Sequence, residues 1–432
     1  MSKSTAVKYE FPFGESTISL SLPDAQVVNE VCGKKAVPVV DIAEAVRQAL
    51  QYPIASPPLN ELIRAGESVV IIVSDVTRRW VRFDLFLPVL LDELNRYGVA
   101  DENITLVVAL GAHRQQTDEE NELVFGREVV KRVAVCQSQA QKEEDFIFFG
   151  TTSRGTPVSI HKRVANADKV IVAGGIVYHI MAGFGGGRKA IMPGVSAYNS
   201  IQANHRLCLH PDAGGGIHPE AYAGSIEANA MNLDQLEIGE MVKPSFLLNA
   251  VFTPEGKFAR FVAGHWRQAW EEGCREVVKG FGVPIREKTD LVVASAGGYP
   301  KDINLYQATK TIANAFQAVK ERGVIVFFLE CRDIQEPQEF SDWFQYDVAQ
   351  REAILREGFT VPGFSALKIG AIAAAVSLIV VSLPQNRSFF EKAGFLVVET
   401  PEEALEKAEQ LLERKDFSVS VMAHAADTLP LL

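Results

Sequence analysis

The segment Tyr178–Gly194, YHIMAGFGGGRKAIMPG, holds the densest group of residues that could do chemistry. Glycine lets backbone amides approach a ligand closely, and one lysine follows the glycine cluster, so the segment predicts a site for a phosphate or a phosphorylated cofactor. It is not a Walker A loop, because Arg188 stands where the second glycine belongs and Ala190 replaces the Ser or Thr that would hold magnesium. A tight turn with a surface lysine is the alternative. The candidate cofactor-binding residues are Gly185, Gly186, Gly187, Arg188 and Lys189.

Three of the eight histidines lie near predicted strand ends or the glycine cluster: His113, His179 and His205. Imidazole suits proton transfer near neutral pH and binds borderline metals such as nickel or zinc. Each of these histidines taken alone is more often structural, whereas three together in such loops make a functional site as plausible as a structural one. The sequence contains no H-x-x-x-H or H-E-x-x-H spacing, so the signature of a zinc hydrolase is absent.

Candidate groups for an anionic substrate lie in two places. In SDVTRRW, Asp75 and Arg78 directly follow a predicted strand, where a guanidinium can bind a carboxylate through two hydrogen bonds. Further along, Tyr306 precedes Lys310 by four residues and Gln307 precedes it by three, which places them on adjoining parts of one helix face. A solvated first helical turn is the alternative, but the helix follows SAGGYPKD closely, which favours a cleft.

These residues need strands and helices that bring them together. Helical patterns at Phe83–Tyr97, Asn304–Glu321 and Asp347–Glu357 alternate with apolar, β-branched runs, so the fold class is α/β, with mainly parallel sheets flanked by helices. Ligands of such sheets gather beyond the carboxyl ends of the strands, where SDVTRR, LGAHRQ, GGIVYH and SAGGYP stand. The runs that predict buried strands are Ser68–Val73, Ile104–Ala109, Lys169–Ala173, Asp290–Ala294, Val324–Leu329 and Leu378–Val381.

A domain boundary is expected near KGFGVPIREKTD, where glycine, proline and charged residues precede a new strand. It gives an N-terminal domain of residues 1–280 and a C-terminal domain of residues 281–432, with the active site in the cleft between them. The N-terminal domain then carries the lysine and the histidines, and the C-terminal domain contributes substrate-binding residues.

Composition excludes several classes of partner. The 432 residues carry a formal net charge of −11 without a basic stripe, so we expect no nucleic-acid partner. The uncharged apolar run between Lys368 and Asn386 is shorter than the roughly 20 residues of a membrane-spanning helix, and it fits a buried helix followed by a buried strand. The N-terminus lacks a secretory stretch, and five cysteines without a C-x-x-C pair suit a reducing compartment, so we expect a cytoplasmic protein.

Five ordered motifs resemble those of the nickel-pincer lactate racemases: SDVTR, LGAHR, GGIVYHIMAGFGGGRKAIMPG, NHRL and SAGGYPKDINLYQATK. The resemblance spans nearly the whole chain and implies inversion of C2 in a small anionic 2-hydroxy acid, with lactate as the first candidate. Hydride would leave C2 and return to its other face, an easier route than removing a very weakly acidic proton. The implied cofactor is the nickel-pincer nucleotide, a nickel pyridinium-3,5-bisthiocarboxylic acid mononucleotide, which dedicated biosynthesis enzymes supply.

The same resemblance implies a role for each candidate residue. Lys189 would form the thioamide link to the cofactor, and His205 would complete the nickel coordination. His113 and His179 would be the acid/base pair that serves the two enantiomers in turn. The positions that hold the substrate anion or its surroundings would be Asp75, Arg78, Tyr306, Gln307 and Lys310.

Two stretches depart from the family pattern. Arg79 and Trp80 replace a proline-containing segment, and CQSQ near Cys136 stands where members often carry a His-Asp pair. An extra cation and an indole would suit a longer, dianionic, aromatic or sugar acid, so a racemase or epimerase of another 2-hydroxy acid is the alternative. Two other classes stay open: a phosphate- or cofactor-binding protein without turnover, and zinc-dependent hydrolysis.

Overall fold

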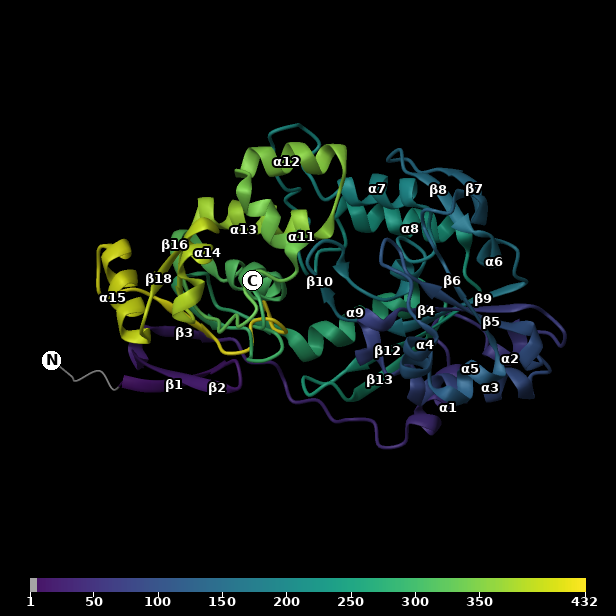
Figure 1. The fold of residues 1–432 in the computed structure, drawn as a ribbon. Helices are drawn as coiled ribbons and strands as arrows, with labels where there is room; N and C mark the ends of the chain where they lie inside the picture. Colours follow the sequence, from purple (N-terminus) through teal and green to yellow (C-terminus); the bar gives the residue numbers. More distant parts are fainter. Residues whose placement is uncertain (1–5) are drawn as a thin grey trace. The chain divides into compact units, whose positions relative to one another are not determined.

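A computed structural model of the chain describes residues 6–432 and divides the chain into two compact units (Figure 1). The N-unit comprises residues 35–208 and 224–280, and the C-unit comprises the residues before 35 together with 209–223 and 281–432. The division therefore differs from a single cut after residue 280. Strand β3 (Val27–Glu30) pairs with a strand of the C-unit sheet, and Glu352 of the C-unit accepts hydrogen bonds from the amides of Gly214 and Gly216.

The N-unit is built on a six-stranded sheet with the order β13-β12-β9-β4-β5-β6. Neighbouring strands are parallel except for β12 and β13, which are antiparallel. Successive strands β4, β5 and β6 extend the sheet in one direction and β9 and β12 in the other, so the strand order reverses at β4. The strands are β4 (Val69–Ser74), β5 (Ile104–Ala109), β6 (Ala134–Gln137), β9 (Lys169–Gly175), β12 (Phe246–Phe252) and β13 (Phe258–Gly264).

Helices and two small hairpins complete the N-unit. The hairpins are β7 (Phe146–Thr151) with β8 (Pro157–His161), and β10 (Tyr178–His179) with β11 (Gly183–Phe184). The helices are α1 (Ile42–Gln51), α2 (Leu59–Leu62), α3 (Phe83–Arg96), α4 (Asp118–Phe125), α5 (Arg127–Arg132), α6 (Lys162–Ala165), α7 (Tyr198–Arg206), α8 (Ala230–Val242) and α9 (Gln268–Phe281).

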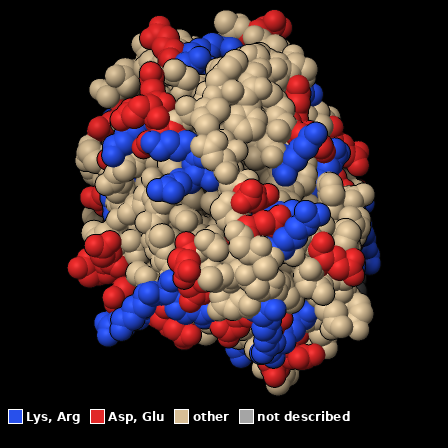
Figure 2. Space-filling model, turned by 90° about the vertical axis from the view of Figure 1, so that its right-hand side faces the viewer, with Lys and Arg blue, Asp and Glu red and all other residues tan. Residues whose placement is uncertain are grey.

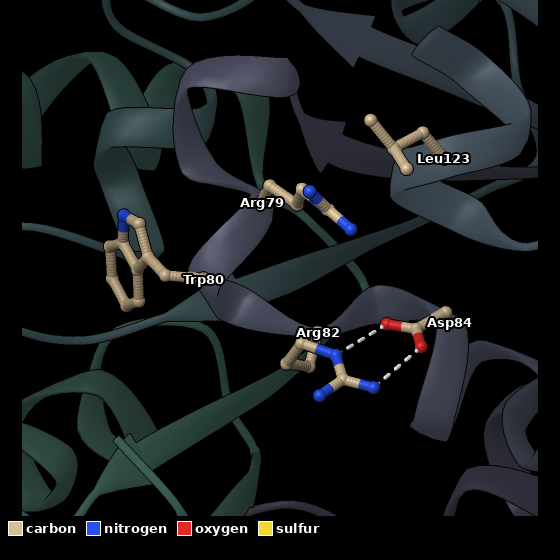
Figure 3. Close-up of a pocket in the computed structure, with 5 residues that line it drawn as sticks. All are labelled: Arg79, Trp80, Arg82, Asp84 and Leu123. Atoms are coloured by element: carbon tan, nitrogen blue, oxygen red, sulfur yellow. Dashed lines mark hydrogen bonds and ion pairs between the residues drawn. The ribbon is translucent and has the colours of Figure 1, made fainter. Parts of the chain in front are cut away.

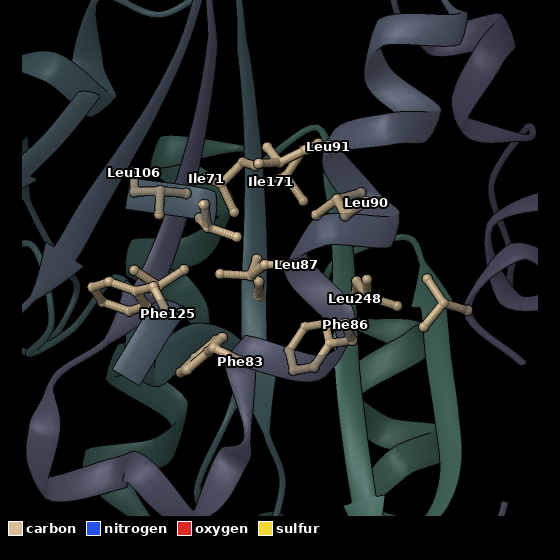
Figure 4. Packing of buried hydrophobic residues seen from close by; sticks show 14 of the residues in the cluster. Ile71, Phe83, Phe86, Leu87, Leu90, Leu91, Leu106, Phe125, Ile171 and Leu248 are labelled. Atoms are coloured by element: carbon tan, nitrogen blue, oxygen red, sulfur yellow. The ribbon is translucent and has the colours of Figure 1, made fainter. Parts of the chain in front are cut away.

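Alternate strand residues and helix α3 form the main core of the N-unit (Figure 4). Each side chain of this kind that is removed from water stabilises the fold by about 1.5–3 kcal/mol. The packed core therefore fixes the strands and the loops at their carboxyl ends. The residues labelled in the figure are Ile71, Leu106, Ile171 and Leu248 of the sheet, Phe83, Phe86, Leu87, Leu90 and Leu91 of α3, and Phe125 of α4.

The C-unit contains an all-parallel six-stranded sheet with the order β18-β17-β16-β15-β19-β3. Helices α10, α11, α13 and α14 pack on one face, and α15 with the β1–β2 hairpin packs on the other. The remaining strands are β1 (Ala6–Phe13), β2 (Ser16–Pro23), β14 (Gly282–Pro284), β15 (Thr289–Ser295), β16 (Val319–Phe328), β17 (Ser377–Val381), β18 (Phe395–Val398), β19 (Val419–Met422) and β20 (Leu429–Leu431). The helices are α10 (Leu305–Phe316), α11 (Gln338–Ser341), α12 (Val348–Glu357), α13 (Val361–Ala375), α14 (Arg387–Lys392) and α15 (Pro401–Leu412).

The fold class is confirmed, with one helix shorter than predicted. Helix α10 ends at Phe316, and β16 begins at Val319, within the stretch predicted to be helical up to Glu321. The reason is that Val319 is buried and pairs with Thr289 of the neighbouring strand. The uncharged run between Lys368 and Asn386 forms the end of α13 followed by β17, a buried helix and a buried strand as predicted.

Candidate active site

The candidate site of the N-unit lies at the carboxyl ends of three adjacent parallel strands, β9, β4 and β5. Asp75 and Arg78 follow β4, His113 follows β5, and His179 and Lys189 follow β9. The strand order reverses at β4, and ligands of open parallel sheets bind beside such a reversal. The sheet thus gathers residues that are more than 100 positions apart in the sequence.

Asp75 and His113 form a hydrogen bond in which the carboxylate fixes the ring. Nδ1 of His113 lies 2.6 Å from Oδ2 of Asp75, and because a carboxylate only accepts, Nδ1 donates the proton. Neutral His113 therefore carries its lone pair on Nε2. Burial alone would raise the pKa of Asp75, but hydrogen bonds from His113 and Thr77 and the charge of Arg78 hold it below its ordinary value of 3.8.

Replacing Asp75 with asparagine should weaken both the orientation of His113 and the acid stability of the fold. We expect kcat to fall about 10- to 100-fold, as is typical when the partner that orients a functional histidine is lost. A carboxyl whose pKa is lowered by folding stabilises the chain above its unfolded pKa, and this stabilisation is lost as the pH falls through the folded value. Urea unfolding between about pH 5 and pH 3 should therefore show a shallower acid decline in Asp75→Asn than in the wild type. Parallel declines would contradict this assignment.

His179 has the opposite tautomer. Its Nδ1 accepts hydrogen bonds from the backbone amides of Met181 and Ala182, each at 3.2 Å. The ring proton of neutral His179 therefore lies on Nε2, which is 2.7 Å from Nζ of Lys189. Since Nε2–H is the donor, the lysine nitrogen accepts, and only an uncharged amine has the lone pair to do so.

The surroundings of Lys189 favour that uncharged form. Burial, reinforced by the positive charges of Arg78 and Arg188, lowers the pKa of Lys189 well below 10.5. The alternative of a tight turn with a surface lysine therefore agrees with the structure in the turn but not in the lysine. The turn exists, but the lysine is half-buried and hydrogen-bonded to an imidazole.

His205 lies near the end of α7 and is 7% exposed. Its Nδ1 donates to the carbonyl oxygen of Ile201 at 2.8 Å, which leaves Nε2 with a lone pair. Burial is the largest cause that lowers the pKa of His205 to about 4. The ring is therefore neutral at pH 7, the form in which imidazole binds a metal.

Packing explains two residues of the glycine cluster. Gly186 and Gly187 have φ values of +67° and +49°, and a side chain on either would collide with Asn249 or Trp270. The amide of Gly187 donates to Oδ1 of Asn249 at 2.9 Å, and Trp270 Nε1 donates to the carbonyl oxygen of Gly185. Neither partner is predicted from the motifs of the sequence, although an asparagine inside the apolar strand FLLNAVF is a signal for the first.

Arg188 has a different place from the one expected of a cofactor-binding residue. Its guanidinium is fully buried, lies 3.9 Å from the centre of the Trp270 ring, and donates to Asn232 Oδ1 and to the carbonyl oxygens of Phe184 and Ala182. Burial lowers its pKa to about 9, so it stays charged at pH 7. Arg188 therefore supports the loop that carries Lys189 from beneath.

Arg188→Met should lower the free energy of unfolding of the chain by about 3 kcal/mol, because three buried acceptors lose their donor. Arg64→Met is a matched control, since Arg64 is exposed and its side chain has no hydrogen bond or ion pair with residues 6–432; the expected change is within about 0.5 kcal/mol. Equal stability of the two variants in urea titrations would rule out the supporting role of Arg188.

Arg79 and Trp80 line a surface depression of about 400 Å³ with Arg82, Asp84 and Leu123 (Figure 3). Arg82 is paired with Asp84, whereas Arg79 points toward Leu123 without a partner among the described residues. Trp80 packs edge-on against Phe252, with ring centres 5.2 Å apart. None of the predicted catalytic side chains lines this depression, so an effect of Arg79 on substrate choice stays a prediction.

The second departure, CQSQ, has a structural role. Gln137 accepts from the amide of Gln116 at 2.9 Å and donates to its carbonyl oxygen at 2.8 Å. The side chain of Gln116 in turn accepts from the amide of Val76, next to Asp75. This chain of hydrogen bonds ties the strand end after β6 to the loops that carry Asp75 and His113.

The remaining candidates lie on a separate part of the chain. Tyr306, Gln307 and Lys310 occupy the first turns of α10 in the C-unit, where Asn304 caps the helix by accepting from the amide of Gln307. The ring of Tyr306 packs against Phe340. Their role toward a substrate stays a prediction.

Charge is mixed on the face of the molecule in Figure 2, where lysine and arginine side chains are interspersed with aspartate and glutamate. Within residues 6–432, no helix is long and apolar enough to cross a membrane. No group of three or more His, Cys, Asp or Glu side chains in that range is placed to hold a metal ion.

Two family models and two relatives with known names match this chain. Residues 13–216 match the family "Lactate racemase N-terminal domain" and residues 285–428 match "Lactate racemase C-terminal domain". The chain is 32% identical over 338 residues to the lactate racemase of Thermoanaerobacterium thermosaccharolyticum, covering 78% of this chain and 77% of that protein. It is 31% identical over 352 residues to the lactate racemase of Lactiplantibacillus plantarum, covering 78% and 81%.

Two solved structures are similar to most of the chain. The lactate racemase apoprotein of T. thermosaccharolyticum superposes with a TM-score of 0.87 at 28% identity, covering 99% of this chain and all of that one. A protein from Thermotoga maritima superposes with a TM-score of 0.60 at 16% identity, covering 93% of this chain and all of that one, which is a likeness of fold alone.

Proposed function

The chain belongs to the lactate racemase family, and from this premise we propose that it inverts C2 of a small 2-hydroxy acid, with lactate as the first candidate substrate. The observation that carries the proposal is the pair of opposite tautomers at the strand ends. His113 presents a lone pair on Nε2, and His179 presents a proton on Nε2. His113 can therefore accept a proton at Nε2, and His179 can donate a hydrogen bond there.

Inversion needs this pair of groups. The hydroxyl of one enantiomer loses its proton to His113, with Asp75 stabilising the charge that develops on the ring. After the carbonyl group has turned its other face, Nε2–H of His179 passes to the oxygen while the proton held by His113 returns to His179 through solvent, so that neither ring is left with a net charge. In the reverse direction the two rings act in the opposite order, so neither enantiomer is favoured by the protein.

The residues also fit the nickel-pincer nucleotide that the family resemblance implies. Lys189 supplies an uncharged amine for covalent attachment, and His205 supplies a neutral Nε2 held in orientation through Nδ1. Lys189 would hold the cofactor through a covalent bond, and His205 would hold it through the metal. When bound, the group supplies the acceptor that takes hydride from C2 and gives it back. Arg78 would hold the substrate carboxylate, with Tyr306, Gln307 and Lys310 as further candidates.

The proposal is tested with protein produced alongside the enzymes that make the cofactor. An intact-mass spectrum should show an added mass that maps to Lys189, and a chiral assay should show interconversion of D- and L-lactate. The panel should include longer, dianionic, aromatic and sugar 2-hydroxy acids, because Arg79 and Trp80 depart from the family pattern. An unmodified, inactive chain despite verified cofactor supply would favour a binding protein, and one zinc without nickel would favour a hydrolase.

A further inference from the structure

The contact between His179 and Lys189 links two residues that the proposed function uses for different tasks, proton transfer and cofactor attachment. The backbone amides of Met181 and Ala182 both point at Nδ1 of the ring and exclude a proton there. These donors are fixed by the β10–β11 hairpin, in which Tyr178 pairs with Phe184 and His179 pairs with Gly183. Nε2–H is thereby aimed at Nζ of Lys189, 2.7 Å away.

We propose that, before the cofactor is attached, His179 holds Lys189 as an uncharged and oriented nucleophile by donating Nε2–H to its amine. His179 is thus a positioning residue for the attachment step as well as a candidate acid in racemisation. The inference rests on the proposed function only in naming the cofactor as the electrophile. A reactive lysine follows from the geometry alone.

An uncharged amine greatly increases the fraction of Lys189 that can attack an electrophile at pH 7. An ordinary lysine, with a pKa of about 10.4, is neutral in only about one molecule in 2,500 at pH 7, and the ammonium form has no lone pair with which to attack. A hydrogen bond to the neutral amine must break when the lone pair turns to an electrophile. That loss corresponds to about a tenfold factor, much smaller than the gain.

Of the charged or titratable groups that act on Lys189, two arginines lower the pKa of its amine and one cysteine raises it. Arg78 from the loop after β4 and Arg188 from the preceding position disfavour the ammonium, and burial does so most strongly. Cys208, which follows α7, acts in the opposite direction and is the smallest influence. His205 on α7 is neutral at pH 7 and adds no charge.

Attachment is a condensation that needs no oxidant or reductant. The lone pair of Nζ attacks the carbon of a carboxyl or thiocarboxyl group, the C–N bond forms, and the C–O bond breaks. The hydroxyl oxygen of the protonated acid leaves as water, with its own proton and one proton from the amine. In the resulting amide or thioamide the nitrogen lone pair is delocalised and no longer accepts a hydrogen bond, so Nε2–H of His179 is released. Attachment of the cofactor therefore frees the very donor that racemisation requires.

The test is competitive labelling of the cofactor-free protein with trace acetic anhydride across a pH series, read residue by residue by mass spectrometry. The midpoint of the labelling profile reports protonation and does not depend on how accessible the amine is. Lys131, which is exposed, is the internal standard. We expect the midpoint of wild-type Lys189 to lie well below that of Lys131.

Two variants separate the hydrogen bond from the bulk of the ring. In His179→Gln, the amide oxygen can accept from Met181 and Ala182 while the NH₂ group donates to Lys189. In His179→Phe, the bulk is kept without a donor. The midpoint for Lys189 should be about one pH unit higher in His179→Phe than in His179→Gln, or about tenfold less labelling at pH 7.

A wild-type midpoint equal to that of Lys131, a result that needs no variant, would overturn the inference, and so would equal midpoints in the two variants. The proposed function fails separately. If Lys189 is labelled at low pH but the protein never takes up the cofactor or racemises an acid, the inference of a reactive lysine holds and the proposed racemase function is wrong. If the cofactor-loaded enzyme is active but Lys189 has the midpoint of an ordinary lysine, the proposed function holds and the inference is wrong.

Discussion

Lys189→Met should yield a folded protein that carries no added mass and does not racemise any 2-hydroxy acid. Methionine keeps the length of the side chain but removes the amine, the one group at this position that can form the covalent link. Because the cofactor would supply the hydride chemistry, we expect activity to fall at least about 1,000-fold, to the background of the assay. Intact-mass spectrometry and the chiral assay measure the two losses on the same sample.

Lys131→Met is the matched control for this variant, since Lys131 lies exposed on α5, outside the loops that follow β4, β5 and β9. It should carry the full added mass and retain wild-type activity. Full activity of Lys189→Met would show that the cofactor works without this link, and an added mass mapping to a different lysine would move the attachment site.

His113→Ala and His179→Gln should each lose about 10²- to 10⁴-fold in kcat while keeping the cofactor. His113 loses the acceptor at Nε2 that Asp75 orients, and glutamine at position 179 cannot exchange a proton at the required rate. The variant at position 179 is glutamine because it keeps a donor to Lys189, so attachment and proton transfer are separated. Turnover of each enantiomer is measured from its own side by chiral chromatography.

Two outcomes would contradict the assignment of these histidines. A loss below about tenfold in either variant would show that the ring is not an acid/base group. Loss of the added mass together with activity would show that the histidine acts in cofactor binding, and the binding-protein alternative would then gain weight.

The N-unit sheet and the edge that carries the candidate site are predictable from the sequence. Runs such as Ile104–Ala109 are buried on both faces of a parallel sheet, so they are almost wholly apolar and easy to find. The polar residues after three such runs then meet, because adjacent parallel strands end at one edge. Asp75, His113 and His179 could be grouped on that basis alone.

The parts that sequence reasoning did not reach depend on contacts distant in the chain. Arg188 beside a glycine cluster has the pattern of a ligand-binding cation, yet it is buried against Trp270, 82 residues further along. The tautomer of His179 depends on the direction of two backbone amides in a hairpin, which no residue type encodes. Residues 209–223 belong to the C-unit, where Glu352 accepts from the amide of Gly214 and Arg356 donates to the carbonyl oxygen of His210. In the sequence, Glu352 and Arg356 have only the spacing of an ordinary ion pair along one helix.

The end of α10 could not be placed from local sequence preference. The stretch up to Glu321 is compatible with a helix in local propensity, but Val319 pairs with Thr289 and begins β16. Tertiary pairing thus overrides a weak local preference, which is the usual outcome at element boundaries.

The most direct test of the central claim is racemisation of lactate that carries deuterium at C2, in ordinary water, by the cofactor-loaded protein. If hydride leaves C2 and returns, the product enantiomer should retain the label, and the reaction should show a primary isotope effect. If the label is instead exchanged for solvent hydrogen as fast as the enantiomers interconvert, C2 loses a proton, and the hydride account of this chain is wrong.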